Sequence, residues 1–126
     1  MSGVVVDASA LAAITFGEPS GEAVAGRLEG ATVFAPALLK YELANIAWKK
    51  AKRDSSNAPG ILKALTLAIG PRCGINWRDV DATDVALIAA ATGLTAYDAS
   101  YLWLAGSLGA DLITLDERLA QVSADV

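Results

Sequence analysis

Four acidic residues stand where this chain has least reason to carry charge. Asp7 ends an apolar run of three valines, and Asp116 closely follows a second apolar run. Glu42 and Asp98 lie on the apolar stripes of two expected helices. A buried carboxylate without a cation is costly, so isolated acids in a core are rare. Four of them indicate one shared site, with a divalent metal among them to offset their repulsion.

The composition limits which chemistry this site can use. A chain of 126 residues fits one compact domain, and we expect a single domain over residues 1–126. The sequence has no His, which excludes His-based acid–base catalysis and His metal ligands. The single Cys73 can form neither an internal disulfide nor a thiolate cluster, which fits a reducing cytoplasm.

The charge balance also bears on possible partners. The net charge is −4, so we expect no general basic grip on phosphate groups. An anionic substrate would need a local attraction, such as a metal or a few basic side chains. No signal peptide is visible, and charges interrupt every apolar stretch before it reaches membrane-spanning length. We therefore expect a cytoplasmic protein with no membrane partner.

Short β-branched runs alternate with longer helical stretches along the chain. The expected strands are residues 4–6, 32–35, 74–77 and 112–115. The expected helices are residues 8–16, 21–28, 38–52, 61–69, 82–92, 97–108 and 117–122. Residues 54–60, which read Asp-Ser-Ser-Asn-Ala-Pro-Gly, are typical of a loop. This alternation predicts an α/β fold, a three-layer α/β/α sandwich with a mainly parallel central sheet.

The predicted fold brings the four acids toward one edge of the sheet. Ligand sites in open α/β sheets lie beyond the carboxyl ends of the strands, where Asp7 and Asp116 are expected. Glu42 is spaced three and four residues from apolar neighbours, which puts it on the core-facing stripe of its helix. Asp98 lies on such a stripe too, and in the first helical turn, where the helix dipole favours negative charge.

Each aspartate also has a purely structural interpretation. Asp7, Asp98 and Asp116 could each be a helix cap, because Asp is favoured at helix starts. For any one of them alone, the two interpretations are equally open. Glu42 has no capping role in mid-helix, and the combination of four acids favours a shared site.

Four short segments resemble those of a known family. They are Val-Val-Asp-Ala-Ser-Ala at 5–10, Tyr-Glu-Leu-Ala-Asn at 41–45, Leu-Thr-Ala-Tyr-Asp-Ala-Ser-Tyr at 94–101 and Ala-Asp-Leu-Ile-Thr-Leu-Asp at 110–116. In this order, and over nearly the whole chain, they resemble a PIN domain. More narrowly, they resemble the VapC-type toxins of bacterial type II toxin–antitoxin pairs. The segment at 94–101 is the most specific of the four.

The resemblance implies a PIN-like fold and a Mg²⁺- or Mn²⁺-dependent ribonuclease whose catalytic set is the four acids. Ser9 and Thr114 match hydroxyl positions near the metal, as supporting residues. The resemblance also implies an RNA substrate, a cognate antitoxin protein that covers the site, and a homodimer. One departure concerns the end of the chain. The family often has a final strand there, but residues 121–126 have little apolar character, so we expect it to be truncated or absent.

The chemistry of Mg²⁺ suggests how the acids divide their roles. Mg²⁺ usually keeps several waters and takes only one or two carboxylates directly. We expect Asp7 and Asp98 as primary metal ligands, with Asp116 as a further ligand or the holder of a second ion. Glu42 would orient a water. A metal-activated water can hydrolyse an RNA phosphodiester bond without a protein nucleophile.

Two basic positions are candidate RNA contacts. Lys49 belongs to the run Lys-Lys-Ala-Lys-Arg at 49–53, and Arg118 follows Asp116 closely. The alternative for the run, which the sequence favours, is a solvated helix end whose cations suit the helix dipole.

Three other classes of protein compete with a ribonuclease. A haloacid-dehalogenase-like phosphotransferase needs a second Asp two residues after the first, where this chain has Ser9. A receiver domain needs an acidic pair near the first strand and a Lys after the last, and neither is evident. A catalytically inactive PIN-like binding module would have lost one or more of the acids, and all four are present.

Overall fold

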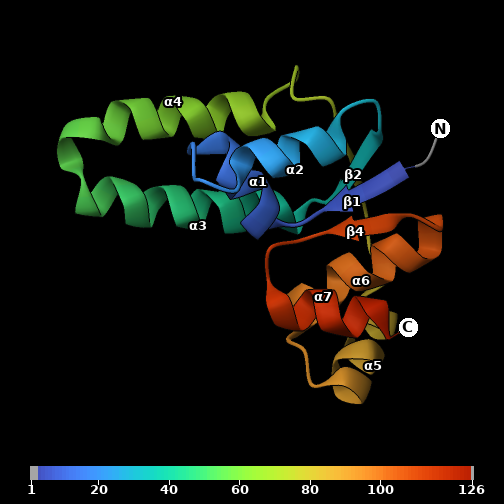
Figure 1. Cartoon of the computed structure of the whole chain (residues 1–126). Coiled ribbons are helices and arrows are strands. Elements are labelled where there is room, and N and C mark those ends of the chain that lie inside the picture. Colours follow the sequence, from blue (N-terminus) through green and yellow to red (C-terminus); the bar gives the residue numbers. More distant parts are fainter. Residues whose placement is uncertain (1–2, 126) are drawn as a thin grey trace.

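The computed structural model describes residues 3–125 as a parallel sheet with helices on both faces (Figure 1). The strands are β1 (Gly3–Val6), β2 (Thr32–Pro36), β3 (Ile75–Arg78) and β4 (Asp111–Ile113). The helices are α1 (Ala8–Thr15), α2 (Gly21–Leu28), α3 (Leu38–Arg53), α4 (Ala58–Ile69), α5 (Ala82–Thr92), α6 (Ala96–Leu108) and α7 (Glu117–Ala124), with a short 3₁₀ turn, η1 (Ser55–Asn57). The predicted α/β/α class is confirmed, and all pairings between these strands are parallel.

The strand order, β3-β2-β1-β4, places β1 between β2 and β4. Val4 lies opposite Val33 of β2 on one side and Asp111 of β4 on the other. Val5 and Val6 are fully buried, as expected for a strand covered on both faces. Because the strands are parallel, their carboxyl ends all meet at one edge of the sheet, where the chain enters α1, α3 and α7 (Figure 1).

Alternating side chains of the strands face two different helical layers. Val6 and Val33 line an apolar hollow with residues of α1, α2 and α4. On the opposite face, Leu112 packs with Leu94, Leu102 and Leu119, which belong to the layer around α6 and α7. The period of two in these strands therefore divides the core between the layers.

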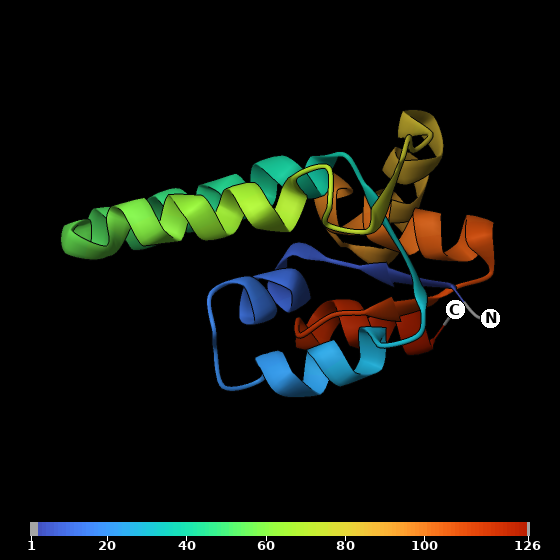
Figure 2. The same cartoon turned by 90° about the horizontal axis from the view of Figure 1, so that it is seen from above.

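The helices α3 and α4 pack against each other and form an arm that extends beyond the sheet (Figure 2). The loop predicted at residues 54–60 is wrong in its second half, because α4 already begins at Ala58. Pro59 lies in the first turn of α4, where a missing amide hydrogen costs nothing. Asp54 organises the tight turn before it, accepting hydrogen bonds from the side chains of Ser56 and Asn57, which lower the pKa of its carboxyl.

The last strand also differs from expectation, whereas the chain end agrees with it. The strand predicted to reach residue 115 ends at Ile113, because Thr114 and Leu115 turn away to bond with the start of α1. After α7 no further strand occurs up to residue 125, so within the described chain β4 is an edge of the sheet. The expected loss of a final strand is thus met in the described residues; Val126 lies outside them.

No single helix between residues 3 and 125 is both long and apolar enough to cross a bilayer. Only α5 and α6 taken together reach that length and composition, and they are bent by 109° at the break between them.

Candidate metal-binding active site

Asp7 stands at the junction of β1 and α1 and is 4% exposed. Its Oδ1 accepts hydrogen bonds from the Ala10 amide (2.9 Å) and the Ser9 hydroxyl (2.7 Å). Its Oδ2 accepts one from the hydroxyl of Thr114. Asp7 therefore caps α1, as the structural interpretation proposed. A carboxylate offers about four acceptor positions, so three bonds still leave room for a ligand.

Two hydroxyl groups join the junction after β1 to the junction after β4. Ser9 Oγ accepts a hydrogen bond from the Leu115 amide at 3.0 Å, and Thr114 Oγ1 accepts one from the Asp116 amide at 3.0 Å. The two hydroxyl oxygens lie 3.3 Å apart. Since both also donate to Asp7, they hold its carboxylate in one orientation relative to Asp116.

Asp116 is the N-cap of α7, with Oδ1 accepting from the Leu119 amide at 2.8 Å. The residue is exposed. Its other carboxylate oxygen accepts no hydrogen bond from residues 3–125. Asp116 thus combines the capping role with an oxygen that residues 3–125 leave free for a ligand.

Asp98 occupies the first turn of α6, as predicted, and is half-buried. The cap of this helix is Thr95, whose hydroxyl accepts from the Asp98 amide at 3.1 Å. The capping alternative for Asp98 is therefore wrong. Within the described part of the chain, its carboxylate has no hydrogen-bond partner.

Glu42 lies half-buried on α3, between the fully buried Leu39 and Leu43. Its Oε1 accepts a hydrogen bond from the hydroxyl of Tyr101, which comes from α6. Sequence reasoning placed Tyr101 only on an apolar stripe and missed this contact. The available signal was its spacing, three residues after Asp98 on the same helix face.

The acids influence one another electrostatically. Burial raises the pKa of Asp7, against the opposing effect of its hydrogen bonds with Thr114, Ala10 and Ser9. Burial also raises the pKa of Glu42 and of Asp98. The negative charges of Asp98 and Asp7 raise the pKa of Glu42 further. In the same way, the negative charges of Asp116 and Asp7 raise the pKa of Asp98 further. The four carboxylates therefore lie close enough to influence one another's ionisation.

No cation of the protein compensates this charge in the described residues. The one ion pair between residues 3 and 125 joins Lys50 to Glu18, which is not part of the site. Partly buried carboxylates that no cation pairs with repel one another when they are ionised. A bound metal cation would offset this repulsion, so such a group favours metal binding.

The oxygen atoms that these side chains offer as metal ligands suit a hard divalent ion. They are carboxylate and hydroxyl oxygens, which Mg²⁺ and Mn²⁺ accept, with no thiolate or imidazole. In residues 3–125, no three acidic groups lie close enough to ligate one ion together. The arrangement therefore fits an ion held directly by one or two carboxylates and otherwise by water.

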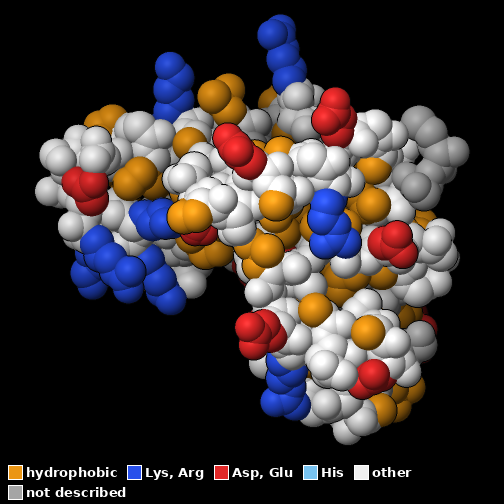
Figure 3. Space-filling view, viewed as in Figure 1, with side chains coloured by type: hydrophobic (Ala, Val, Ile, Leu, Met, Phe, Trp, Pro, Cys, Tyr) orange, Lys and Arg blue, Asp and Glu red, His pale blue; other side chains and the backbone are white. Residues whose placement is uncertain are grey.

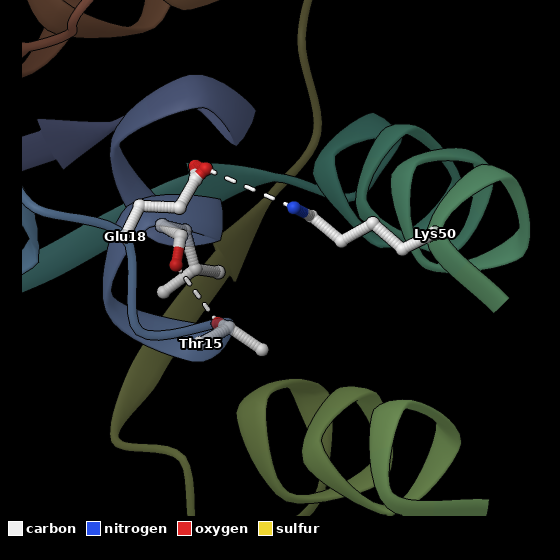
Figure 4. Close-up of polar contacts among 4 residues, drawn as sticks. Thr15, Glu18 and Lys50 are labelled. Atoms are coloured by element: carbon white, nitrogen blue, oxygen red, sulfur yellow. Dashed lines mark hydrogen bonds and ion pairs between the residues drawn. The ribbon is translucent and has the colours of Figure 1, made fainter. Parts of the chain in front are cut away.

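A groove lined by several basic side chains shares Ser9 with this site. We call it the basic groove: a hollow of about 380 Å³ between α1 and α3, lined by Ser9, Ala12, Glu18, Ile46, Lys49, Lys50, Arg53 and Leu115. Figure 4 shows Lys50 reaching from α3 toward Glu18, which follows α1. Lys and Arg side chains gather over the C-terminal end of α3 in Figure 3. Ser9, the hydroxyl partner of Asp7, thus lines the same hollow as the α3 cations.

Arg118 is placed differently from Lys49. It is exposed on α7, and its Nη2 donates to the Gly93 carbonyl at 3.2 Å. This contact ties α7 to the turn between α5 and α6. Gly93 has φ of +77°, a conformation that L side chains rarely adopt, so glycine suits this turn.

Comparison with known proteins agrees with this geometry. The family model named PIN domain matches residues 4–125. Ribonuclease VapC3 of Pyrobaculum aerophilum is 34% identical over 122 residues, covering 94% of this chain and 92% of that protein. Ribonuclease VapC12 of Mycobacterium tuberculosis is also 34% identical over 122 residues, covering 94% and 90%.

Solved structures show the same fold. The crystal structure of PAE2754 from Pyrobaculum aerophilum matches with a TM-score of 0.76 and 28% identity, over 94% of this chain and 82% of that one. The structure of Mycobacterium tuberculosis VapC20, described as a sarcin–ricin loop cleaving toxin, matches with a TM-score of 0.68 over 95% of each chain. At 12% identity, this second likeness concerns the fold alone.

These matches span nearly the whole chain, so they leave no place for a haloacid-dehalogenase-like or receiver assignment. The chain belongs to the PIN-domain family, among its VapC-type ribonucleases.

Proposed function

We propose that this protein is a ribonuclease toxin of a type II toxin–antitoxin pair and that it requires Mg²⁺ or Mn²⁺. The observation that carries the proposal is the group of four carboxylates at the carboxyl edge of the sheet, which no Lys or Arg of residues 3–125 pairs with. The sequence similarity of this chain to VapC-type ribonucleases supports the same activity.

The acids and hydroxyls take distinct roles in this proposal. Asp7 and Asp98 hold the ion directly, and Asp116 contributes its free oxygen through a bound water or to a second ion. Ser9 and Thr114 keep the Asp7 carboxylate turned toward the ion, since both donate to it. A bound divalent ion would polarise a phosphoryl oxygen of RNA and acidify an attacking water. Glu42, on the adjacent helix, orients that water and accepts its proton, to which its raised pKa is suited.

Lys49 and Arg53 are proposed contacts for RNA phosphates in the basic groove. Lys50 faces Glu18, and Lys52 lies over the ring of Trp48 at 5.1 Å, so both have partners within the protein. Because Ser9 and Leu115 line the same groove as Lys49, the position of Lys49 supports an RNA contact over a merely solvated helix end. Arg118 is a second candidate, through the guanidinium nitrogens that do not bond Gly93.

We also propose that residues 1–126 act as one domain in the cytoplasm, with no membrane partner. A cognate antitoxin would cover the site, and a second copy of the chain would form a homodimer. Exposed apolar side chains, such as Trp48 on α3 and Leu67 on α4, are suited to contact with another protein.

The direct test is cleavage of a panel of structured RNAs by the purified protein. The panel includes a sarcin–ricin loop, the substrate class named for VapC20. We expect cleavage with Mg²⁺ or Mn²⁺, and none with EDTA or with Asp98→Asn. Equal cleavage in EDTA would overturn the metal requirement, and equal cleavage by Asp98→Asn would overturn its role as a ligand.

Growth of a bacterial host separates a toxin from an inactive PIN-like module. Expression of the wild type should arrest growth, and expression of Asp98→Asn should not. Co-expression of the neighbouring small DNA-binding protein, where the genome encodes one, should restore growth. Normal growth at verified wild-type levels, together with no cleavage of any RNA in vitro, would favour the inactive module.

A further inference from the structure

Glu42 is the one acid of the site that does not lie at the start or end of a secondary-structure element. Its side chain leaves the middle of α3 and has three rotatable bonds, so fixing it has an entropic cost. The one hydrogen bond that its carboxylate makes with residues 3–125 comes from Tyr101. The position of Glu42 in the site therefore depends on that hydroxyl.

Tyr101 is well placed to fix another side chain. It is 1% exposed and belongs to the main hydrophobic core, so packing sets the position of its ring. A tyrosine has only two side-chain torsions, and little freedom remains once the ring is packed. Burial and the nearby carboxylate raise the pKa of the Tyr101 hydroxyl, so the group stays protonated and can donate.

The hydrogen bond between Tyr101 and Glu42 also connects two helices of the site, α6 and α3. Tyr101 follows Asp98 by three residues on α6 and so lies on the same helix face. One face of α6 thus presents a proposed metal ligand and also a donor for Glu42 of α3. A shift of α6 relative to α3 would move both carboxylates together.

We propose that Tyr101 is a positioning residue of the ribonuclease: its buried hydroxyl holds Oε1 of Glu42 and leaves Oε2 to bind the attacking water. This inference rests on the proposed function. It adds to the catalytic machinery a residue, Tyr101, that does not itself touch the substrate. A phenylalanine in place of Tyr101 would keep the ring in the core and lose only the hydroxyl.

The main test compares Tyr101→Phe with the wild type in steady-state cleavage of RNA with Mn²⁺. We expect kcat to fall by about 10- to 100-fold, the usual range for residues that orient others at metal sites. KM should stay unchanged, because the hydroxyl does not face the RNA. The control is Tyr41→Phe, since Tyr41 is next to Glu42 in sequence but 71% exposed; this variant should match the wild type.

A double-mutant cycle tells a positioning role from a general loss of packing. In a Glu42→Gln background, Tyr101→Phe should cause no further loss of kcat, because the residue through which it acts is already disabled. If the two losses instead multiply, Tyr101 acts by another route and the proposal is wrong. A Tyr101→Phe enzyme with wild-type kcat would overturn it as well.

A measurement without RNA keeps the inference separate from the proposed function. In metal-free wild-type protein, carbon NMR should show the Tyr101 Cζ shift following the titration of the Glu42 carboxyl. In Tyr101→Phe the pKa of Glu42 should rise, because the hydrogen bond from Tyr101 lowers it. A Tyr101 signal that ignores Glu42 would refute the link even if the variant fails to fold. A wild type inactive on every RNA would refute the proposed function, and the NMR result would still decide the link.

Discussion

The hydroxyl of Thr114 donates a hydrogen bond to Asp7, a residue 107 positions earlier in the chain. The bond crosses from the end of β4 to the end of β1, two neighbouring strands of the sheet. It therefore orients a proposed metal ligand and also closes the carboxyl edge of the sheet.

Thr114→Val should weaken both functions of this contact. The substitution keeps the shape of the side chain and removes a donor to a buried carboxylate, a loss of about 2 kcal/mol in the free energy of unfolding. Urea denaturation measures that loss, and RNA cleavage should fall with it. The matched control is Thr66→Val, because the Thr66 hydroxyl bonds only the Leu62 carbonyl on the surface of α4. Equal stability of the two variants would argue against a stabilising role for the hydrogen bond between Thr114 and Asp7.

Stability of the metal-free protein should fall as the pH rises above the ordinary carboxyl pKa values of 3.8 and 4.5. Asp7, Glu42 and Asp98 have raised pKa values, so the folded state holds their protons more tightly than the unfolded chain. Their stabilising effect is complete below the ordinary values of 3.8 and 4.5 and is lost as the pH rises through the folded values. Asp54, with a lowered pKa, is already ionised above pH 5 and does not contribute to this trend.

The measurement for this prediction is urea denaturation in EDTA across that pH range. Asp98→Asn should be more stable than the wild type at pH 8 and should show a smaller slope with pH, because one repelling charge is gone. An identical slope for the two proteins would mean that Asp98 does not feel the other carboxylates.

Addition of Mn²⁺ should reverse the loss at pH 8. An ion that binds only the folded state stabilises it by about 2.7 kcal/mol at a concentration 100 times its Kd. We expect thermal melting of the wild type to shift upward with Mn²⁺ and that of Asp98→Asn to shift much less. The control is Asp111→Asn, an exposed residue at the opposite, amino end of β4. A shift in Asp98→Asn as large as in this control would place the ion elsewhere.

The basic groove makes a prediction about salt. Lys49→Ala combined with Arg53→Ala should lower kcat/KM about tenfold at low ionic strength and flatten its dependence on salt by about 0.7 per lost phosphate contact on single-stranded RNA. Binding of Mn²⁺ should not change. The control pair is Lys63→Ala with Arg72→Ala, which removes the same charge from exposed positions outside the groove. If both pairs behave alike, the run on α3 is only a solvated helix end.

The sequence predicted the alternation of strands and helices well, because burial imposes clear periods of two and 3.6 residues on the apolar side chains. Its errors fall where local signals conflict. Residues 54–60 carry loop-forming residues, yet Pro59 suits the first turn of α4, and packing against α3 extends the helix there. The strand at 112–115 has the right composition throughout, but hydrogen bonds with Ser9 and Asp7 draw its last two residues out of the sheet.

The order of residues alone was enough to single out the four acids as candidates, since a charge in an apolar pattern stands out without any knowledge of the fold. It was not enough to assign their partners. The contacts of Thr114 with Asp7, of Tyr101 with Glu42 and of Arg118 with Gly93 join residues 107, 59 and 25 positions apart. No local pattern encodes such pairs, because each depends on the packing of separate strands and helices into one core. The same packing brings α3 cations beside Ser9, and so creates the basic groove that the sequence had shown only as a helix end.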